Sequence, residues 1–181
     1  MILDLNKIIN NNISYKLIKT NKLVNVHQIP IIKKIIVTSS FNKEFETNAK
    51  FKESVISDYL RFTFLKTKFV EVKHSVSNFD IRKGDIIGVK VILNKDRALS
   101  FLTKIIFIVL PQIRELVNWS KSNFDDDGNF SFGLQEQLIF PEIGFKEERK
   151  VFGMNITIVF SSSNVSQSFN LLKILGFPLT N

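Results

Sequence analysis

The side chains best suited to binding chemistry gather in one polar segment near the middle of the chain. Cationic groups there could pair with phosphates, hydroxyl and amide groups could form hydrogen bonds, and one aromatic ring could stack on an unpaired base. This combination predicts contact with RNA, although a solvated hairpin loop in any basic protein explains the same residues equally well. The candidates are Lys73, His74, Ser75, Asn78, Phe79, Arg82 and Lys83.

Patterns for catalysis or metal binding are missing from the sequence. The absence of cysteine excludes disulfides, thiolate metal sites and cysteine nucleophiles. His27 and His74 have no carboxylate at a metal-ligand spacing, so both are predicted at the surface or at the rim of the core. The run Asp125-Asp126-Asp127-Gly128 has its glycine at position 4 instead of position 6 of a calcium loop and no predicted helix on both sides, so it predicts a solvated turn. No phosphate-binding glycine loop or nucleophile elbow occurs. We therefore expect no enzyme activity, no metal and no cofactor.

The overall charge favours a polyanionic partner. The 181 residues carry a net charge of +8, and each Lys or Arg set against a phosphate releases counterions. Ile, Lys, Asn and Phe, which have A/T-rich codons, are frequent, whereas alanine occurs only at Ala49 and Ala98. An A/T-rich genome, as in organelles, endosymbionts and some parasites, explains this bias and also inflates the lysine count.

Targeting and membrane signals are weak. The longest apolar stretch, residues 105–110, is far shorter than the roughly 20 residues of a spanning helix, so no membrane span is predicted. Residues 1–12 lack the features of a transit or signal peptide. The protein is therefore expected either to be made where it works or to have lost a targeting segment already.

Hydrophobic spacing predicts an alternation of helices and strands. Helices are expected over 3–19, from about 48 to 65 after Thr47 as N-cap, from Asp96 as N-cap to a bend or end at Pro111, and after Asn164 as N-cap. Strands are expected over 31–38, 69–73, 88–94 and 151–160, with an irregular strand over 134–140 after a polar excursion that starts at 118.

This order favours an α+β fold, with a mainly antiparallel sheet and helices packed on one face, over a doubly wound parallel sheet. A single domain over residues 1–181 is expected. It would consist of an N-terminal helical segment over 1–24 and an α+β core over 25–181.

A set of short motifs also runs through the chain in a distinctive order. They are Asn25-Val26, Gln28-Ile29-Pro30 and Lys34-Ile35; Ser75, Phe79, Ile81-Arg82, Gly84 and Ile87-Gly88; Arg97, Pro111 and Ile113-Arg114; residues 122–125, 128–133 and 136–143; and Gly153, residues 156–158 and Phe177-Pro178. Together they resemble the large-subunit ribosomal protein five family, which binds 5S rRNA. The resemblance covers the chain from about its first residue to its last.

The resemblance implies a structural role in the central protuberance of the large ribosomal subunit. The family holds 5S rRNA and a neighbouring rRNA hairpin, beside other central-protuberance proteins. One of its loops, Ser75 to Gly88 here, approaches P-site tRNA, and another surface meets a protein of the small-subunit head. A free-standing RNA-binding or RNA-processing factor is the alternative. The expected RNA-binding residues are Lys33, Lys34, Lys73, His74, Ser75, Asn78, Phe79, Arg82, Lys83 and Arg97.

Three departures fall where the family pattern is associated with the 5S rRNA face. Residues 38–40 (Thr-Ser-Ser) replace an asparagine with nearby glycines, Phe64-Leu65 replace a Gly-Gln pair, and residues 92–95 (Ile-Leu-Asn-Lys) replace Thr-Leu-Arg-Gly. RNA groups facing Leu65 or Ile92 would lose hydrogen-bond partners, so we expect a 5S rRNA that is divergent, reduced or absent. With the A/T-rich composition, this favours an organelle-encoded protein of the ribosome in the mitochondrial matrix over a plastid or a reduced bacterium.

Overall fold

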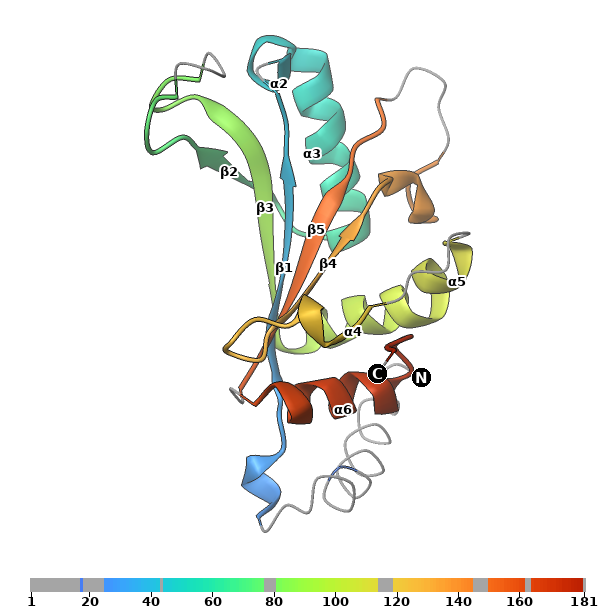
Figure 1. Cartoon of the computed structure of the whole chain (residues 1–181). Coiled ribbons are helices and arrows are strands. Elements are labelled where there is room, and N and C mark those ends of the chain that lie inside the picture. Colours follow the sequence, from blue (N-terminus) through green and yellow to red (C-terminus); the bar gives the residue numbers. More distant parts are fainter. Residues whose placement is uncertain are drawn as a thin grey trace. The chain divides into compact units, whose positions relative to one another are not determined.

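The computed structural model of the chain describes residues 17, 25–42, 44–76, 81–113, 119–144, 150–161 and 164–180 (Figure 1). These residues belong to two compact units. The first comprises the described residues of Met1–Ile35, Leu93–Phe132 and Thr157–Asn181, and the second comprises those of Ile36–Ile92 and Gly133–Ile156. Apart from Leu17, the expected N-terminal helix over 3–19 lies outside the described residues. The expectation of one domain with boundaries at 24 and 25 stays a prediction.

Five strands form an antiparallel sheet, which confirms the expected α+β class. Their order is β2-β3-β1-β5-β4, and β2 pairs antiparallel with β3. The irregular strand expected over 134–140 is misplaced, because the strand ends at Leu134 and a 3₁₀ turn follows at Gln137–Ile139. The strands are β1 (Ile32–Ser40), β2 (Lys68–Glu71), β3 (Ile86–Asn94), β4 (Phe130–Leu134) and β5 (Met154–Phe160).

Each long strand has one buried face, as the period of two in its sequence predicts. In β1, Ile35 and Val37 are buried while Lys34 and Ile36 on the other face are only half-buried. In β5 the buried residues are Met154, Ile156, Ile158 and Phe160. The buried faces form the cores, and the opposite faces are available for contact.

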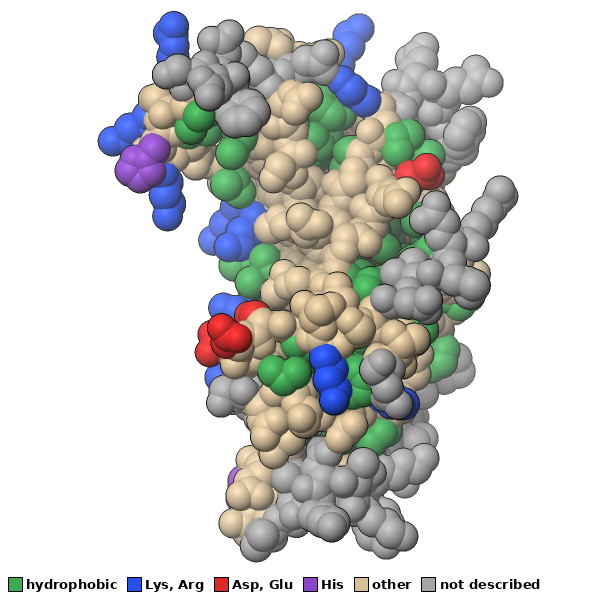
Figure 2. Space-filling model, viewed as in Figure 1, with side chains coloured by type: hydrophobic (Ala, Val, Ile, Leu, Met, Phe, Trp, Pro, Cys, Tyr) green, Lys and Arg blue, Asp and Glu red, His purple; other side chains and the backbone are tan. Residues whose placement is uncertain are grey.

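Helices are present in both units. The second unit contains α2 (Glu44–Thr47) and α3 (Ala49–Thr63), whose buried stripe includes Val55, Tyr59 and Phe62. The first unit contains α4 (Lys95–Lys104), α5 (Leu110–Gln112) and α6 (Val165–Leu175). In the second unit, α3 lies behind the strands in the view of Figure 1, and the opposite face of these strands is turned toward the viewer in Figure 2.

Two of the three predicted N-caps are wrong. The Asn164 side chain accepts a hydrogen bond from the Ser166 N–H at 3.0 Å, so this cap is confirmed. Thr47 instead ends α2, and the neighbouring Asn48 caps α3 by accepting from the Phe51 N–H at 3.2 Å. Asp96 lies in the first turn of α4, one residue past its start. A carboxylate there still interacts favourably with the helix dipole, which is why it imitates a cap in the sequence.

The helix containing Pro111 ends close to that residue, as predicted. A wide turn at Ile105–Val109 joins α4 to α5, and within it the Leu110 N–H donates to the Ile105 carbonyl. The helix ends at Gln112, and Ile113 is already extended. Because proline has no N–H and its ring clashes with the preceding turn, a helix tends to widen or end there.

Two residues other than glycine have positive φ among the described parts of the chain. They are Phe64, with φ 56°, at the C-terminal end of α3, and Lys95, with φ 50°, at the start of α4. Glycine adopts this conformation without a steric penalty, so a side chain with a Cβ costs free energy at both positions.

A buried polar chain joins α3 to the sheet inside the second unit. The Ser39 hydroxyl donates to the Gly153 carbonyl at 2.8 Å, and the Tyr59 hydroxyl lies 2.6 Å from the Ser39 oxygen. Since the single hydroxyl proton of Ser39 is already used, Tyr59 must be the donor of the second bond. Burial raises the pKa of Tyr59 well above its ordinary value, although the Ser39 hydrogen bond lowers it slightly, so the phenol keeps this proton.

Replacing Tyr59 with phenylalanine is expected to lower the free energy of unfolding by about 1 kcal/mol, because the ring packing survives and one buried hydrogen bond is lost. Urea unfolding of the two proteins measures this difference. Ser40→Ala, on an exposed neighbour of Ser39 in β1, is the control and should change stability by less than about 0.5 kcal/mol. Equal stability of Tyr59→Phe and the unmodified chain would contradict a stabilising hydrogen bond between Tyr59 and Ser39.

Candidate nucleic-acid interface

The loop between β2 and β3 continues the hairpin beyond both strands. The Val72 N–H donates to the Asp85 carbonyl and the Gly84 N–H donates to the Val72 carbonyl, each at 3.0 Å. Further out, Val76 and Ile81 exchange backbone hydrogen bonds of 2.9 and 3.4 Å. Gly84 has a φ of 97°, which only glycine adopts easily. The backbone at the base of the loop is therefore held by hydrogen bonds and supports the residues that follow.

Two polar side chains fix the backbone that carries the basic residues. The Asp85 carboxylate accepts from the Arg82 N–H at 2.8 Å, and the Ser75 hydroxyl oxygen accepts from the Lys83 N–H at 2.9 Å. Both backbone groups are thus satisfied within the loop, while the Arg82 and Lys83 side chains are exposed. Ser75, predicted as a binding residue, has a positioning role here, and its hydroxyl proton can still be donated outward.

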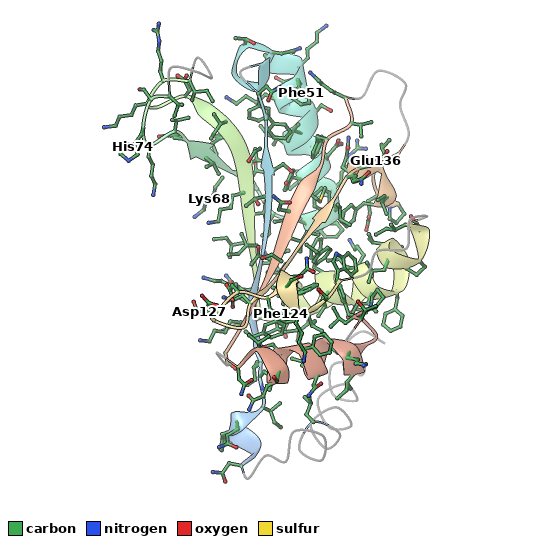
Figure 3. All side chains as sticks on the ribbon, viewed as in Figure 1. Phe51, Lys68, His74, Phe124, Asp127 and Glu136 are labelled. Carbon is green, nitrogen blue, oxygen red and sulfur yellow. The ribbon has the colours of Figure 1, made fainter. Side chains whose placement is uncertain are left out.

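The described part of the loop presents a concentration of positive charge. Lys73, His74, Arg82 and Lys83 are all exposed, and Figure 2 shows Lys, Arg and His side chains gathered over this end of the hairpin. Figure 3 labels His74 at its outer side. Of the acids near the described part of the loop, Asp85 is half-buried and accepts a backbone hydrogen bond, and Glu71 is exposed at the end of β2. Asn78 and Phe79 lie outside the described residues, so their predicted contacts stay predictions.

The other predicted binding residues belong to the first unit. Lys33 is exposed on β1, and the adjacent Lys34 is half-buried on the opposite face of the strand. Arg97 is exposed in the first turn of α4. The structure thus brings together Lys73, His74, Ser75, Arg82 and Lys83 in one loop, whereas Lys33, Lys34 and Arg97 lie in a different unit.

The open face of the second unit holds two cations that the analysis of the sequence missed. Lys68 on β2 is the cross-strand partner of Lys90 on β3, and Figure 3 labels Lys68 beside β2. Both side chains point away from the buried face, because Val89 and Val91 on either side of Lys90 are buried. Like charges directly opposite in a sheet destabilise it, and a bound anion relieves that repulsion. The alternation of Lys90 with buried valines was the signal that could have identified it.

Around this lysine pair the open face combines glycine and polar residues with two isoleucines. Gly88 crosses β1 so closely that a Cβ would overlap the Ser39 carbonyl oxygen. The Asn155 amide oxygen lies over Gly133, where a Cβ would approach it to 3.3 Å. A surface of this kind admits an extended ligand such as an RNA backbone, with hydroxyl and amide groups to bond it. The other outward residues of this face include the polar Thr38, Ser40 and Asn155 and the half-buried isoleucines Ile36 and Ile92.

The acidic run forms a closed turn, as predicted. The Asp125 carboxylate accepts from the Asn129 backbone N–H at 2.6 Å and from the Asn129 side-chain amide at 2.8 Å. Gly128 adopts a φ of 74° within it. His27 and His74 are both exposed, which confirms their predicted surface position. No cluster of three or more potential metal ligands occurs within the described ranges.

Among the helices that the structure describes, none has the length and apolar character needed to span a membrane.

The chain is similar to known proteins of the ribosomal L5 family. The model of the ribosomal L5P family C-terminus matches residues 86–179. The large ribosomal subunit protein uL5 of Prochlorococcus marinus strain MIT 9515 is 39% identical over 166 residues, which are 92% of this chain and 93% of the relative. The uL5 protein of Spiroplasma kunkelii is 35% identical over 178 residues, 98% of both chains.

A plastid relative matches to the same degree. The uL5c protein of Cyanidium caldarium is 36% identical over 168 residues, which are 93% of this chain and 92% of the relative. The resemblance noted in the motifs is therefore confirmed over nearly the full length. These are structural proteins of the ribosome and not enzymes. With identities above one third and this coverage, the chain belongs to the uL5 family of large-ribosomal-subunit proteins.

Proposed function

We propose that the chain is a structural constituent of the large ribosomal subunit that binds rRNA in the central protuberance. The observation that carries the proposal is the pair of basic surfaces in the second unit, the loop with Lys73, Arg82 and Lys83 and the open face with Lys68 and Lys90, in a member of the uL5 family. Cations held on an ordered backbone bind phosphates at little entropic cost. The work of the protein is to position RNA.

The loop between β2 and β3 is proposed to reach toward P-site tRNA. Its ordered base, fixed by the Asp85 and Ser75 hydrogen bonds, supports cations at the end of a hairpin rather than within a packed surface. Such a projection can touch a mobile ligand while the body of the protein stays on rRNA. For the protein as a whole, inside and outside this loop, the residues proposed to bind RNA are Lys33, Lys34, Lys73, His74, Ser75, Asn78, Phe79, Arg82, Lys83 and Arg97.

The partners proposed beyond rRNA are neighbouring central-protuberance proteins and a small-subunit head protein. 5S rRNA is proposed to be divergent, reduced or absent, because Phe64-Leu65 and Ile92 offer it no polar side chain. We propose a mitochondrial ribosome as the setting, on the A/T-rich composition and these departures; a plastid or a reduced bacterium is the alternative. An electron cryo-microscopy map with an ordinary 5S rRNA against the open face would contradict the altered-5S proposal.

Replacing Arg82 and Lys83 together with alanine is expected to weaken binding to large-subunit rRNA roughly tenfold to a hundredfold and to reduce the salt slope of log K by about two. Both side chains are exposed, so folding should be unchanged. Filter binding at several salt concentrations measures affinity and slope, and circular dichroism measures folding. Lys121→Ala, at an exposed lysine outside the loop, is the control. Unfolding of the double variant would contradict the assignment of this loop to the surface.

A free-standing RNA-binding or RNA-processing factor is the rival function. Sedimentation separates the two. A ribosomal constituent co-migrates with large subunits and resists moderate salt, whereas a free factor stays near the top of the gradient or dissociates early.

A further inference from the structure

Phe64 occupies a position whose backbone does not favour it. It ends α3 in the left-handed conformation, with φ 56° and ψ 25°, and its N–H donates to the Leu60 carbonyl at 2.9 Å. A side chain with a Cβ costs free energy in this conformation, and glycine does not.

The Phe64 ring is mostly exposed in spite of this backbone cost. The Phe64 side chain is 73% exposed, so most of its apolar surface stays in water. Leu60, one helical turn earlier, is also 47% exposed. The helix end therefore holds a large ring in contact with solvent, on a backbone fixed by a capping hydrogen bond. A rigid exposed aromatic of this kind loses little entropy when a ligand packs on it.

The chain around the ring is basic. Arg61, Lys66 and Lys68 are exposed, and no Asp or Glu occurs from Tyr59 to Val70. Lys68 in addition faces Lys90 across the two strands, an arrangement that an anion stabilises. An aromatic ring flanked by cations is the combination with which proteins hold unpaired bases: the ring stacks on the base, and the cations meet the adjoining phosphates.

We propose that Phe64 is a stacking platform for one unpaired RNA base, with the flanking phosphates on Arg61, Lys66 and Lys68. The inference rests on the proposed rRNA-binding function and adds the mode of contact at this position. Stacking requires no hydrogen-bonding side chain, so it holds RNA at a place where Phe64-Leu65 offer none. The excess of exposed cations here, three in the segment from Tyr59 to Val70 before the first exposed acid at Glu71, favours a polyanion over a protein segment as the partner.

The test compares Phe64→Gly, Phe64→Trp and Lys95→Gly in the full chain. Lys95→Gly is the matched control, because it relieves the other left-handed residue without removing an aromatic ring. The probe is a short single-stranded oligouridylate that contains one 2-aminopurine. Phe64→Gly should bind it about tenfold more weakly, with an unchanged salt slope, because a stacked base is lost and no phosphate contact is. The fluorescence change on binding should disappear in Phe64→Gly and persist in Phe64→Trp.

Thermal unfolding tests whether weaker binding by Phe64→Gly reflects a loss of stability. It should not, because both glycine variants should melt at or above the melting temperature of the unmodified chain. Unchanged affinity of Phe64→Gly for the probe overturns the stacking inference and leaves the rRNA role intact. The stacking inference is also overturned if Phe64→Gly is no longer incorporated into large subunits while its RNA affinity is unchanged, because the ring would then contact protein. If the unmodified chain binds neither the probe nor large-subunit rRNA, the proposed function itself fails.

Discussion

Replacing Ile158 with aspartate is expected to unfold the protein. Ile158 is fully buried on the inner face of β5, in line with Ile156 and Phe160 on the same face. A carboxylate there would lose its hydration without gaining a charged partner, and the cavity left by the shorter side chain adds to the cost. The expected loss is more than about 4 kcal/mol, which is comparable to the whole stability of a small domain.

The control for this variant lies on the same strand. Asn155→Asp introduces the same charge on an exposed residue of the opposite face and should change the free energy of unfolding by less than about 0.5 kcal/mol. Near-ultraviolet circular dichroism and urea titration distinguish the two. A cooperative transition for Ile158→Asp at the denaturant concentration of the unmodified chain would show that β5 does not line the core as described.

Replacing Gly88 with alanine is expected to have the second largest effect, a loss of about 3 kcal/mol, because overpacking of this kind forces backbone shifts. The new Cβ would overlap the Ser39 carbonyl oxygen and come within 3.4 Å of the Ser39 carbonyl carbon and the Ser40 Cα. All three are backbone atoms, so no side-chain rotation can relieve the clash. The variant should therefore separate β3 from β1 and also distort the open face.

Gly144→Ala is the matched control, because nothing lies within 4 Å of a Cβ at that position. It should leave stability within about 0.5 kcal/mol of the unmodified chain. Differential scanning calorimetry of the two variants measures the contrast. Equal melting temperatures for Gly88→Ala and Gly144→Ala would contradict the close approach of β1 and β3.

Periodicity was sufficient to predict the elements that have one buried face. The alternation through Ile156, Ile158 and Phe160 located β5, and the helical spacing of Val55, Tyr59 and Phe62 located α3. These patterns are local and depend only on which face is buried. The first residue of a helix depends on which of several adjacent polar residues takes the cap position. This explains the errors at Thr47 and Asp96, where asparagine stands at the cap position instead.

The candidate site was only partly predictable. Charge and polarity identified the loop residues Lys73, Arg82 and Lys83, because they are clustered in the sequence. The pairing of Lys68 with Lys90 depends on the register of two strands and is not encoded in either segment alone. The positive φ of Phe64 was equally hidden, since phenylalanine gives no sign of a left-handed backbone. The positioning roles of Ser75 and Asp85 emerged only with the loop geometry.

Sucrose-gradient sedimentation of the full chain with ribosomes of its source, before and after ribonuclease treatment, tests the central claim most directly. We expect the chain to travel with large subunits through moderate salt and to be released when the rRNA is digested, because its basic surfaces bind RNA phosphates. A chain that stays at the top of the gradient while the large subunits are intact at low salt would contradict this account.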